Sequence, residues 1–383
     1  MKSAPDKRYR RVVAKVGTNL LTAGGDSLDR PTIASLVAQV AALQEAGLDV
    51  VVVTSGAIAA GRDALGVGKG RRDVPFNQML AAVGQGRLMH LYHELFQQHG
   101  INVAQVLITK GDLDNREGYL NVRNTMVGLL GLGVVPLVNE NDVVDVREIG
   151  EAVFGDNDSL SAAVANLVDA DLLAILTDID GLYTADPRRD PQAKLIEQVD
   201  RIDGRIEALA GGTGGAWARG GMVTKIEAAR SATLCGIPVA IANGQVPQVM
   251  ERLVAGEAIG TLFTPSVSKV DSRQRWMLSG LSARGSITID EGAARALTGK
   301  SSSLLPAGIR GVEGDFGRGD LVDIIDADGS RIGCGLTNYG AVDLDKIRGA
   351  NSSEILKLLG YRFGDEVVHR NDLVILDRVA QTS

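Results

Sequence analysis

Asp49-Val50-Val51-Val52-Val53-Thr54-Ser55-Gly56 is the stretch that decides the fold class of this 383-residue chain. Its run of valines leaves no polar face, which is typical of a strand buried on both sides in a parallel sheet. Ser55 and Gly56 follow directly, so the strand delivers a hydroxyl group at its carboxyl end. The carboxyl ends of parallel strands are where α/β folds collect ligand-binding groups. The stretch therefore predicts an α/β domain with a site at this edge of the sheet.

Further apolar strands precede and follow this one. We expect them, in chain order, at Arg11–Val16, Val103–Ile108, Val134–Val138, Asp171–Leu176 and Ile237–Ala242. Helical patterns separate them: Pro31 opens a helix that runs to Ala46, and amphipathic stretches cover Phe76 to His99 and Glu117–Leu130. Apolar strands that alternate with helices predict a three-layer α/β/α sandwich with a mainly parallel sheet.

Two clusters of amides and carboxylates adjoin apolar runs. Val134–Val138 leads into Asn139-Glu140-Asn141-Asp142, and Ala152–Phe154 leads into Gly155-Asp156-Asn157-Asp158. Asn both donates and accepts hydrogen bonds whereas Asp only accepts, so together they can hold the ammonium and the carboxylate of a zwitterion. Either cluster alone reads equally well as an Asn/Asp-rich turn. The presence of both, together with the two lysines described below, predicts a ligand site.

The sequence lacks the common nucleotide-binding motifs. No Gly-x-Gly-x-x-Gly follows the first strand, and the Walker-like string Leu297–Ser301 has Ala294 at the position of the leading glycine. A glycine tract, Gly211–Gly215, runs towards Gly220–Lys225, where a helix is expected to begin near Met222. Glycine N–H groups and a helix N-terminus suit phosphate, so this tract predicts phosphate contact together with the Gly17 turn. A flexible surface loop is the alternative interpretation.

Composition narrows the class of protein. A chain of this length predicts two domains, and its charged N-terminus lacks the apolar core of a secretion signal. No run of about 18 apolar residues is present, so we expect a soluble, cytoplasmic protein without a membrane span. Cys235 and Cys334 match no metal-binding spacing, and His90 and His93 fit a helix surface, so no metal site is predicted. The net charge of −7 argues against a broad nucleic-acid footprint.

A series of motifs identifies the chain as similar to a known family. They are Val13–Thr18, Val53–Ile58, Asn139–Asp142, Phe154–Asp158, Leu176–Asp178, Gly181–Pro187 and Gly220–Lys225. These motifs recur in this order in the glutamate 5-kinases, a branch of the amino acid kinases, which the chain resembles over nearly its whole length. One departure is visible, because Gly212–Gly215 is separated from the Gly220-Gly221-Met222 motif that it adjoins in many relatives. The resemblance implies the amino acid kinase fold.

The resemblance also implies a reaction, in which the γ-phosphoryl group of ATP passes to the side-chain carboxylate of L-glutamate. That carboxylate has an ordinary pKa of about 4.3 and is already ionised at neutral pH, so no general base is needed. Positioning and charge must then supply the catalysis. We assign Lys15 and Lys225 to the transferring phosphoryl group, with Asp158 holding the two lysines in register. Lys15 lies within an apolar strand, where burial without an anion would be costly. Mg²⁺ is implied as the ion that neutralises the phosphates, carried by the nucleotide.

The remaining site residues follow from the resemblance. Ser55, Asp142 and Asn157 resemble the glutamate-binding positions, with Asn139 and Asp156 as supports. Ser55 has an alternative interpretation as the N-cap of the next helix. The expected ATP-binding residues are Lys15, Gly17, Thr177, Asp178, Arg219, Gly220, Gly221, Met222, Val223, Thr224 and Lys225.

The C-terminal part of the chain has a different pattern. We expect a kinase domain over residues 1–265, a linker over 266–280 and a second domain over 281–383. Short strands between glycine turns, including Asp320–Ile324 and Ile332–Leu336, predict a small β-barrel-like domain that resembles the PUA domain. PUA domains occur in RNA-modifying enzymes, which raises RNA binding as a rival function. From Trp276 onward the chain has 12 Lys and Arg against 15 Asp and Glu, which argues against it.

Other expectations concern partners and alternatives. A sister kinase acting on acetylglutamate, aspartate or a nucleoside monophosphate is a further alternative, disfavoured by Asn139–Asp142 and by the PUA-like segment. The family resemblance implies the first step of proline biosynthesis, feedback inhibition by proline and a homo-oligomer.

Overall fold

The computed structural model describes residues 9–68, 73–144, 157–210, 221–266, 268, 283–300 and 302–376. The chain divides into two compact units. The first comprises Met1–Leu113 and Thr125–Ser268, and the second comprises Asp114–Asn124 and Lys269–Ser383. Each unit has its own sheet. No helix among the described ranges is long and apolar enough to cross a membrane.

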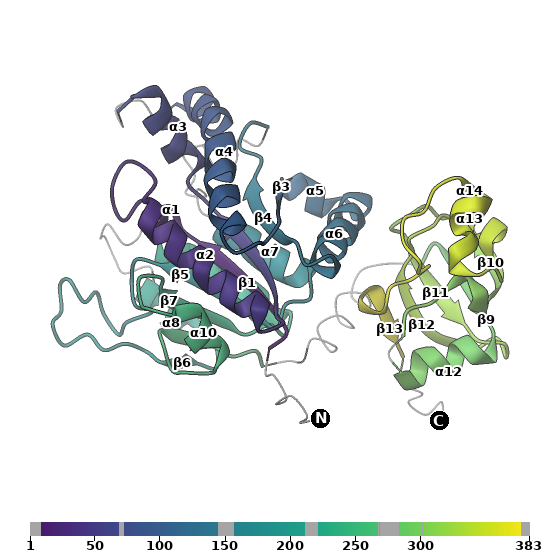
Figure 1. Ribbon diagram of the computed structural model, residues 1–383. Coiled ribbons are helices and arrows are strands. Elements are labelled where there is room, and N and C mark those ends of the chain that lie inside the picture. The colour runs from purple at the N-terminus through teal and green to yellow at the C-terminus, as the bar shows by residue number, and fades with distance from the viewer. Residues whose placement is uncertain are drawn as a thin grey trace, which may run out of the picture. The chain divides into compact units, whose positions relative to one another are not determined.

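The first unit is built on an eight-stranded sheet in the order β3-β4-β2-β1-β5-β7-β8-β6 (Figure 1). The strands are β1 (Arg11–Val16), β2 (Asp49–Thr54), β3 (Val103–Ile108), β4 (Val135–Glu140), β5 (Leu172–Thr177), β6 (Gln198–Val199), β7 (Val239–Asn243) and β8 (Thr261–Phe263). Neighbouring strands are parallel except β7 and β8. Strands β2 to β4 lie on one side of β1 and β5 to β8 on the other. The topology therefore changes direction at β1, the kind of point where α/β sheets bind ligands.

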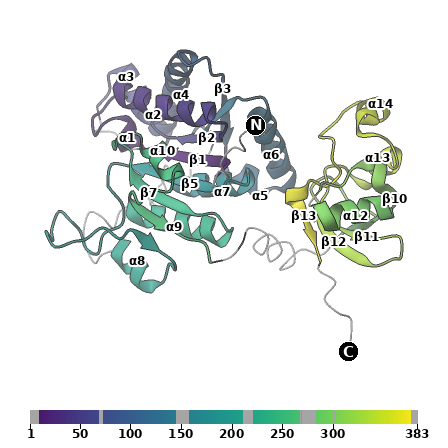
Figure 2. The same cartoon turned by 60° about the horizontal axis from the view of Figure 1, so that its bottom comes forward.

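Helices cover both faces of this sheet (Figure 2). One face carries α2 (Arg30–Glu45), α4 (Val74–Gln97) and α10 (Val249–Val254), whereas the other carries α7 (Asp158–Leu167) and α9 (Met222–Leu234). The other helices of the first unit include α1 (Thr18–Leu21), α3 (Ala57–Leu65), α5 (Lys110–Asp114) and α8 (Gly204–Ala210). Helix α6 (Arg116–Gly131) is divided between the units, because its residues up to Asn124 belong to the second. This arrangement confirms the predicted three-layer α/β/α sandwich with a mainly parallel sheet.

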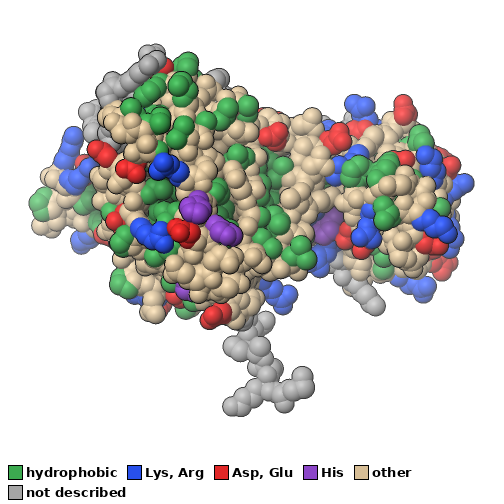
Figure 3. All heavy atoms as spheres, turned by 45° about the horizontal axis from the view of Figure 1, so that its top comes forward, with side chains coloured by type: hydrophobic (Ala, Val, Ile, Leu, Met, Phe, Trp, Pro, Cys, Tyr) green, Lys and Arg blue, Asp and Glu red, His purple; other side chains and the backbone are tan. Residues whose placement is uncertain are grey.

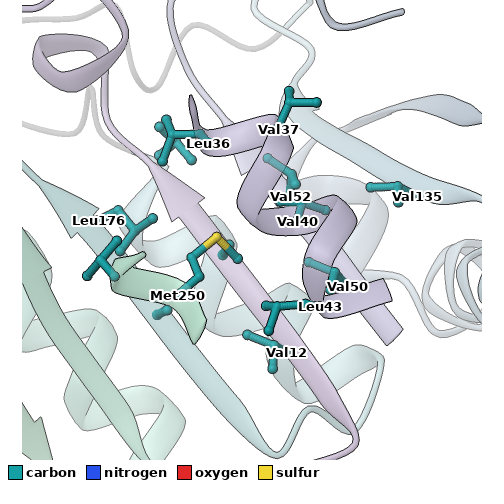
Figure 4. Packing of buried hydrophobic residues seen from close by; sticks show 14 of the residues in the cluster. Val12, Leu36, Val37, Val40, Leu43, Val50, Val52, Val135, Leu176 and Met250 are labelled. Atoms are coloured by element: carbon teal, nitrogen blue, oxygen red, sulfur yellow. The ribbon is translucent and has the colours of Figure 1, made fainter. Parts of the chain in front are cut away.

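The core beneath α2 fixes which way the side chains of β1 point. Val12 lies in an apolar cluster with Val50 of β2, Leu43 of α2 and Met250 of α10 (Figure 4). Ala14 and Val16 belong to the same cluster. Successive side chains of a strand alternate between faces, so Lys15 emerges on the opposite face, which α7 covers.

The second unit contains a five-stranded sheet in the order β10-β9-β11-β12-β13. Its strands are β9 (Gly285–Ile289), β10 (Ile309–Gly314), β11 (Leu321–Ile325), β12 (Arg331–Leu336) and β13 (Leu373–Ile375). Among the described strand pairs of this unit, β9 and β11 are parallel and the other pairs are antiparallel. This unit also contains the helices α12 (Glu291–Lys300), α13 (Ala341–Ile347) and α14 (Ile355–Leu359). Its apolar core includes Ile287, Val322 and Tyr339.

The expected elements differ from the observed ones mainly at their ends. Strands β1, β2 and β3 have the predicted bounds, whereas β4 continues to Glu140 rather than ending at Val138. Backbone pairing of Asn139 with Leu107 and of Glu140 with Ile108 extends it, although Asn is a poor strand former. The Asn139 side chain therefore projects from a strand and not from a turn. The strand expected at Ala152–Phe154 lies outside the described residues.

Candidate functional site

Lys15 is the central residue of the candidate site. It lies in the middle strand β1, paired with Val53 of β2 and Ile175 of β5, and its side chain is 0% exposed. A buried ammonium requires a counter-charge because desolvation otherwise makes it very unfavourable. Its Nζ lies 2.7 Å from Oδ1 of Asp158, which is equally buried.

Asp158 joins Lys15 to a second lysine from another helix. It is the first residue of α7, where the helix dipole favours a carboxylate. Its Oδ2 lies 3.1 Å from Nζ of Lys225 and accepts a hydrogen bond of 2.8 Å from Oγ1 of Thr224. Lys225 also donates to the carbonyl oxygen of Gly221 at 3.0 Å, which holds its ammonium at the start of α9. The structure thus brings the three residues assigned to phosphoryl transfer into one buried cluster with a net charge of +1.

A chain of amide side chains leads away from this cluster. The two N–H groups of Asn157 Nδ2 are shared among three acceptors, namely the main-chain oxygen of Thr54, Oγ of Ser55 at 3.1 Å and Oδ1 of Asn139 at 2.8 Å. Asn139 in turn donates from Nδ2 to Oε1 of Gln85 at 2.8 Å. We call Asn157, Asn139 and Gln85 the amide relay. The relay connects α7, β4 and α4, and it passes the end of β2.

Gln85 of the amide relay and Tyr92, which contacts Thr54, were not expected from the sequence. Gln85 and Tyr92 both belong to α4, and Tyr92 OH lies 2.9 Å from Oγ1 of Thr54. Burial raises the pKa of Tyr92 to about 12, so its hydroxyl stays protonated at neutral pH. The one signal in the sequence is the glycine beside Gln85. A Cβ on Gly84 would stand 1.8 Å from the Ala57 main-chain oxygen, so α4 must pass close to α3 at this point.

Ser55 does not cap the following helix. The N-cap of α3 is Gly56, which has a φ of 99° and offers no side-chain cap. A left-handed φ of this kind is accessible to glycine without steric cost. The Ser55 hydroxyl is instead held by Asn157, which favours the site interpretation over the capping alternative.

The expected nucleotide residues gather at the ends of β1 and β5. The Gly17 N–H donates to the Leu176 carbonyl at 3.3 Å, so the two strand ends are tied together. Thr177 ends β5 and donates from Oγ1 to Oδ1 of Asp178 at 3.0 Å. Asn19 donates to the other oxygen of Asp178 at 3.2 Å, although Asn19 was not among the expected residues. Asp178 is exposed and therefore accessible to a ligand.

The other expected residues fall into three groups. Gly221 is the N-cap of α9 and lacks a capping side chain, and Met222, Val223 and Thr224 form the first turn of this helix. Asp142 follows β4 and is half-buried. Asp156, Arg219 and Gly220, with the tract Gly211–Gly215, lie outside the described residues.

The described residues offer no ready-made metal cage. Within the described ranges, no three His, Cys, Asp or Glu side chains are grouped so that they could hold a metal ion. Triphosphate oxygens are the usual partners of Mg²⁺, which is seldom held by an all-protein cage.

Comparison with known proteins assigns the chain to a family. The amino acid kinase family model matches residues 10–243, and the PUA domain model matches residues 285–359. The chain is 53% identical over 368 residues to a glutamate 5-kinase from Dehalococcoides mccartyi, covering 96% of this chain and 99% of that protein. It is 51% identical to the glutamate 5-kinase of Deinococcus radiodurans, with 96% of this chain and 100% of that protein covered.

A solved structure is also similar. The crystal structure of a UMP kinase from Bacillus anthracis matches 68% of this chain and 97% of that chain, with a TM-score of 0.47 and 17% sequence identity. The relatives cover both units almost completely, at about half of all positions identical. The chain belongs to the glutamate 5-kinase family, with an amino acid kinase domain followed by a PUA domain.

Proposed function

We propose that this protein is a glutamate 5-kinase that transfers the γ-phosphoryl group of ATP to the side-chain carboxylate of L-glutamate. The observation that carries the proposal is the buried Lys15–Asp158–Lys225 cluster at the point where the sheet topology changes direction. Its net positive charge suits a transition state in which negative charge is spread over the transferring phosphoryl oxygens. The identity of the substrates comes from the names of the relatives.

The chemistry needs no proton transfer. An oxygen of the glutamate carboxylate forms a bond to the γ-phosphorus, while the bond from that phosphorus to the β–γ bridging oxygen breaks. ADP leaves with the electron pair, and L-glutamyl 5-phosphate is formed. Lys15 and Lys225 approach the reacting group from a strand and a helix, and Asp158 fixes both ammonium groups before substrate binds. Mg²⁺, carried on the nucleotide, would neutralise phosphate charge.

The amide relay is the proposed amino-acid side of the site. Ser55 and Asn157, with Asn139 behind them and Asp142 at the rim, would hold the glutamate. Asn157 and Asp158 are consecutive, so the residue that touches the amino acid is covalently joined to the residue that orients the lysines. Gly17, Thr177, Asp178 and the first turn of α9 would face the nucleotide.

Coupled measurement of ADP release tests the proposal. With Mg²⁺ and ATP, we expect ADP release to depend on L-glutamate and not on acetylglutamate, aspartate or UMP at matched concentrations. Activity with one of those acceptors in place of glutamate would overturn the proposal. Hydroxylamine trapping of the product as a hydroxamate distinguishes acyl phosphate formation from hydrolysis of ATP.

We also propose four finer assignments, of which the first three rest on the family. The reaction would be the first step of proline biosynthesis, and proline would compete with glutamate. Glutamate saturation curves should then shift to higher glutamate concentration when proline is present. An unshifted curve would contradict inhibition by proline. We propose a homo-oligomer, and sedimentation analysis of the purified protein would test this oligomeric state. The domain bounds 1–265, 266–280 and 281–383 are tested by limited proteolysis between residues 266 and 280.

RNA binding receives no support from charge. On the face of the C-terminal unit shown in Figure 3, basic and acidic side chains are interspersed. Several of its arginines are paired with carboxylates, including Arg331 with Asp323 at 2.7 Å and Arg310 with Asp290 at 2.9 Å. Phosphate-backbone binding depends on an uncompensated basic surface. Catalysis in the first unit therefore remains the proposed main function.

A further inference from the structure

The direction of the amide relay is fixed by a main-chain group. The carbonyl oxygen of Thr54 can only accept, so the nearby atom of Asn157 must be the donor Nδ2. The same Nδ2 lies against Asn139, which must therefore present Oδ1 and turn its own Nδ2 towards Gln85. Gln85 then accepts through Oε1. Each amide is thus held in one orientation by its neighbour.

With the three amides oriented in this way, one acceptor and one donor of the relay have no hydrogen-bond partner among the described residues. Asn157 Oδ1 and Gln85 Nε2 are both buried and have no hydrogen-bond partner among the described residues. The Asn157 residue is only 4% exposed, so water does not readily satisfy its amide oxygen. Buried amide groups without partners are uncommon in native proteins, because each loses its hydrogen bond to water without gaining another. A ligand that supplies a donor to one end and an acceptor to the other would remove both penalties.

An α-amino acid supplies that pair of groups, since its ammonium donates and its α-carboxylate accepts. The sheet order places Asn139 on β4, two strands from Lys15 on β1. Two strand spacings amount to about 10 Å, which sets the Gln85 end of the relay apart from the phosphoryl cluster. The carboxylate that would meet Gln85 is therefore the non-reacting α-carboxylate, while the side-chain carboxylate approaches the lysines.

We propose that Gln85 is a specificity-determining residue that donates from Nε2 to the α-carboxylate of the amino-acid substrate while its Oε1 orients Asn139. The assignment rests on the proposed glutamate kinase activity and adds a residue that the sequence motifs do not contain. Its placement depends on helix packing. Gly84 and Gly61 let α4 approach α3, because a Cβ on either would stand less than 2 Å from a main-chain oxygen of the other helix.

Two substitutions separate contact with substrate from support of Asn139. Gln85→Glu keeps an acceptor for Asn139 but replaces the donor with a carboxylate oxygen. Gln85→Met removes both functions at similar size. The control is Gln97→Glu, the same chemical change at an exposed position of α4. Loss of a charge-assisted hydrogen bond predicts a glutamate KM raised at least about tenfold in both Gln85 variants, with the ATP KM unchanged.

A second substrate sharpens the test. L-Isoglutamine carries an amide in place of the α-carboxylate, and that amide can donate to the new carboxylate of Gln85→Glu. The preference for L-glutamate over L-isoglutamine, expressed as a ratio of kcat/KM values, should therefore fall in Gln85→Glu and stay at the wild-type value in Gln97→Glu.

The outcomes are distinguishable. A wild-type protein without glutamate-dependent ADP release would overturn the proposed function. A wild-type protein that is active, with a Gln85→Glu variant of unchanged glutamate KM and unchanged preference, would overturn the inference alone. If only Gln85→Met raises KM, Gln85 merely supports Asn139 and the α-carboxylate contact is wrong. Thermal melting of each variant confirms folding, and Gln85→Glu, which keeps the Asn139 hydrogen bond, decides the matter if Gln85→Met does not fold.

Discussion

Replacement of Asp158 by Asn tests the physical core of the proposed site. The substitution keeps shape but removes the Asp158 carboxylate, which contacts both Lys15 and Lys225, so the charge of this three-residue cluster rises from +1 to +2. At an effective dielectric constant of about 20, a pair at 2.7 Å attracts by about 6 kcal/mol and a pair at 3.1 Å by about 5 kcal/mol. Desolvation of the three groups offsets much of this attraction in the wild type.

The expected loss of stability is smaller than the gross attraction but still large. Removing one partner from a buried ion pair costs roughly 3–5 kcal/mol, because the remaining charge loses an attraction that offset its desolvation. For a domain of this size that loss lowers the melting temperature by about 6–20 °C. We also expect kcat to fall at least about a hundredfold, since the ammonium groups lose their fixed positions.

Nucleotide should compensate for the missing carboxylate. A non-hydrolysable ATP analogue brings negative charge to the two lysines, so it should raise the melting temperature of Asp158→Asn more than that of the wild type. The control is Asp372→Asn in the second unit, where the buried Asp372 pairs with Arg123 at 3.0 Å. This variant should lose stability but keep the wild-type response to the analogue.

Differential scanning calorimetry with and without the analogue decides the prediction. A melting temperature of Asp158→Asn equal to that of the wild type would refute the view that both ammonium groups depend on this carboxylate. An analogue-induced shift no larger than that of the wild type would refute the assignment of the lysines to phosphate.

Further predictions concern individual side chains. Lys15→Ala and Lys225→Ala should each lower kcat at least about a hundredfold, and a change confined to the ATP KM in initial-rate kinetics would contradict a catalytic role. Asp142→Asn should raise the glutamate KM by roughly 10–150-fold with little effect on the ATP KM, and an unchanged glutamate KM would remove Asp142 from the pocket. Gly84→Ala places a Cβ 1.8 Å from a main-chain oxygen of α3, so denaturant unfolding should show a loss of about 3 kcal/mol or more; wild-type stability would mean that α3 and α4 are not in close contact. The folded pKa of Tyr92 is raised from 10.0 to about 12, so its contribution to stability is complete below pH 10 and is lost as the pH rises towards 12. Tyr92→Phe should therefore lose less stability than the wild type over this pH interval. Equal losses in the two proteins would contradict burial of the phenol.

The part of the fold that sequence could predict is the part governed by continuous apolar runs. Strands β1, β2 and β3 begin and end where predicted because polar residues or glycine bound each run. The end of β4 was wrong by two residues. Asn139 and Glu140 are held in the strand by their pairing with β3, a tertiary contact that local propensity does not encode.

The candidate site likewise contains residues that the sequence could predict and residues that it could not. Lys15 was identifiable because a lysine inside an apolar strand requires an anion, and the structure supplies Asp158. Gln85 and Tyr92 were missed because seven residues separate them on α4, which is ordinary amphipathic spacing for a helix. Their roles depend on contacts with Asn139 and Thr54, which lie 54 and 38 residues away in the chain. The packing of α4 against α3, where glycines allow a close approach, and against α2 brings them to the site.

The junction between Asn157 and Asp158 explains why binding and chemistry should be coupled here. The Asn157 side chain reaches towards the ends of β2 and β4, whereas that of Asp158 reaches towards β1 and α9. In the proposed site, a displacement of the relay would therefore be passed to the start of α7 and to the carboxylate between the lysines. Binding energy from the remote end of the amino acid can be used in this way to hold the reacting groups in position. If Gln85 contacts the substrate as proposed, the close contact of α3 with α4 bears on catalysis, although neither helix carries a residue of the charged cluster.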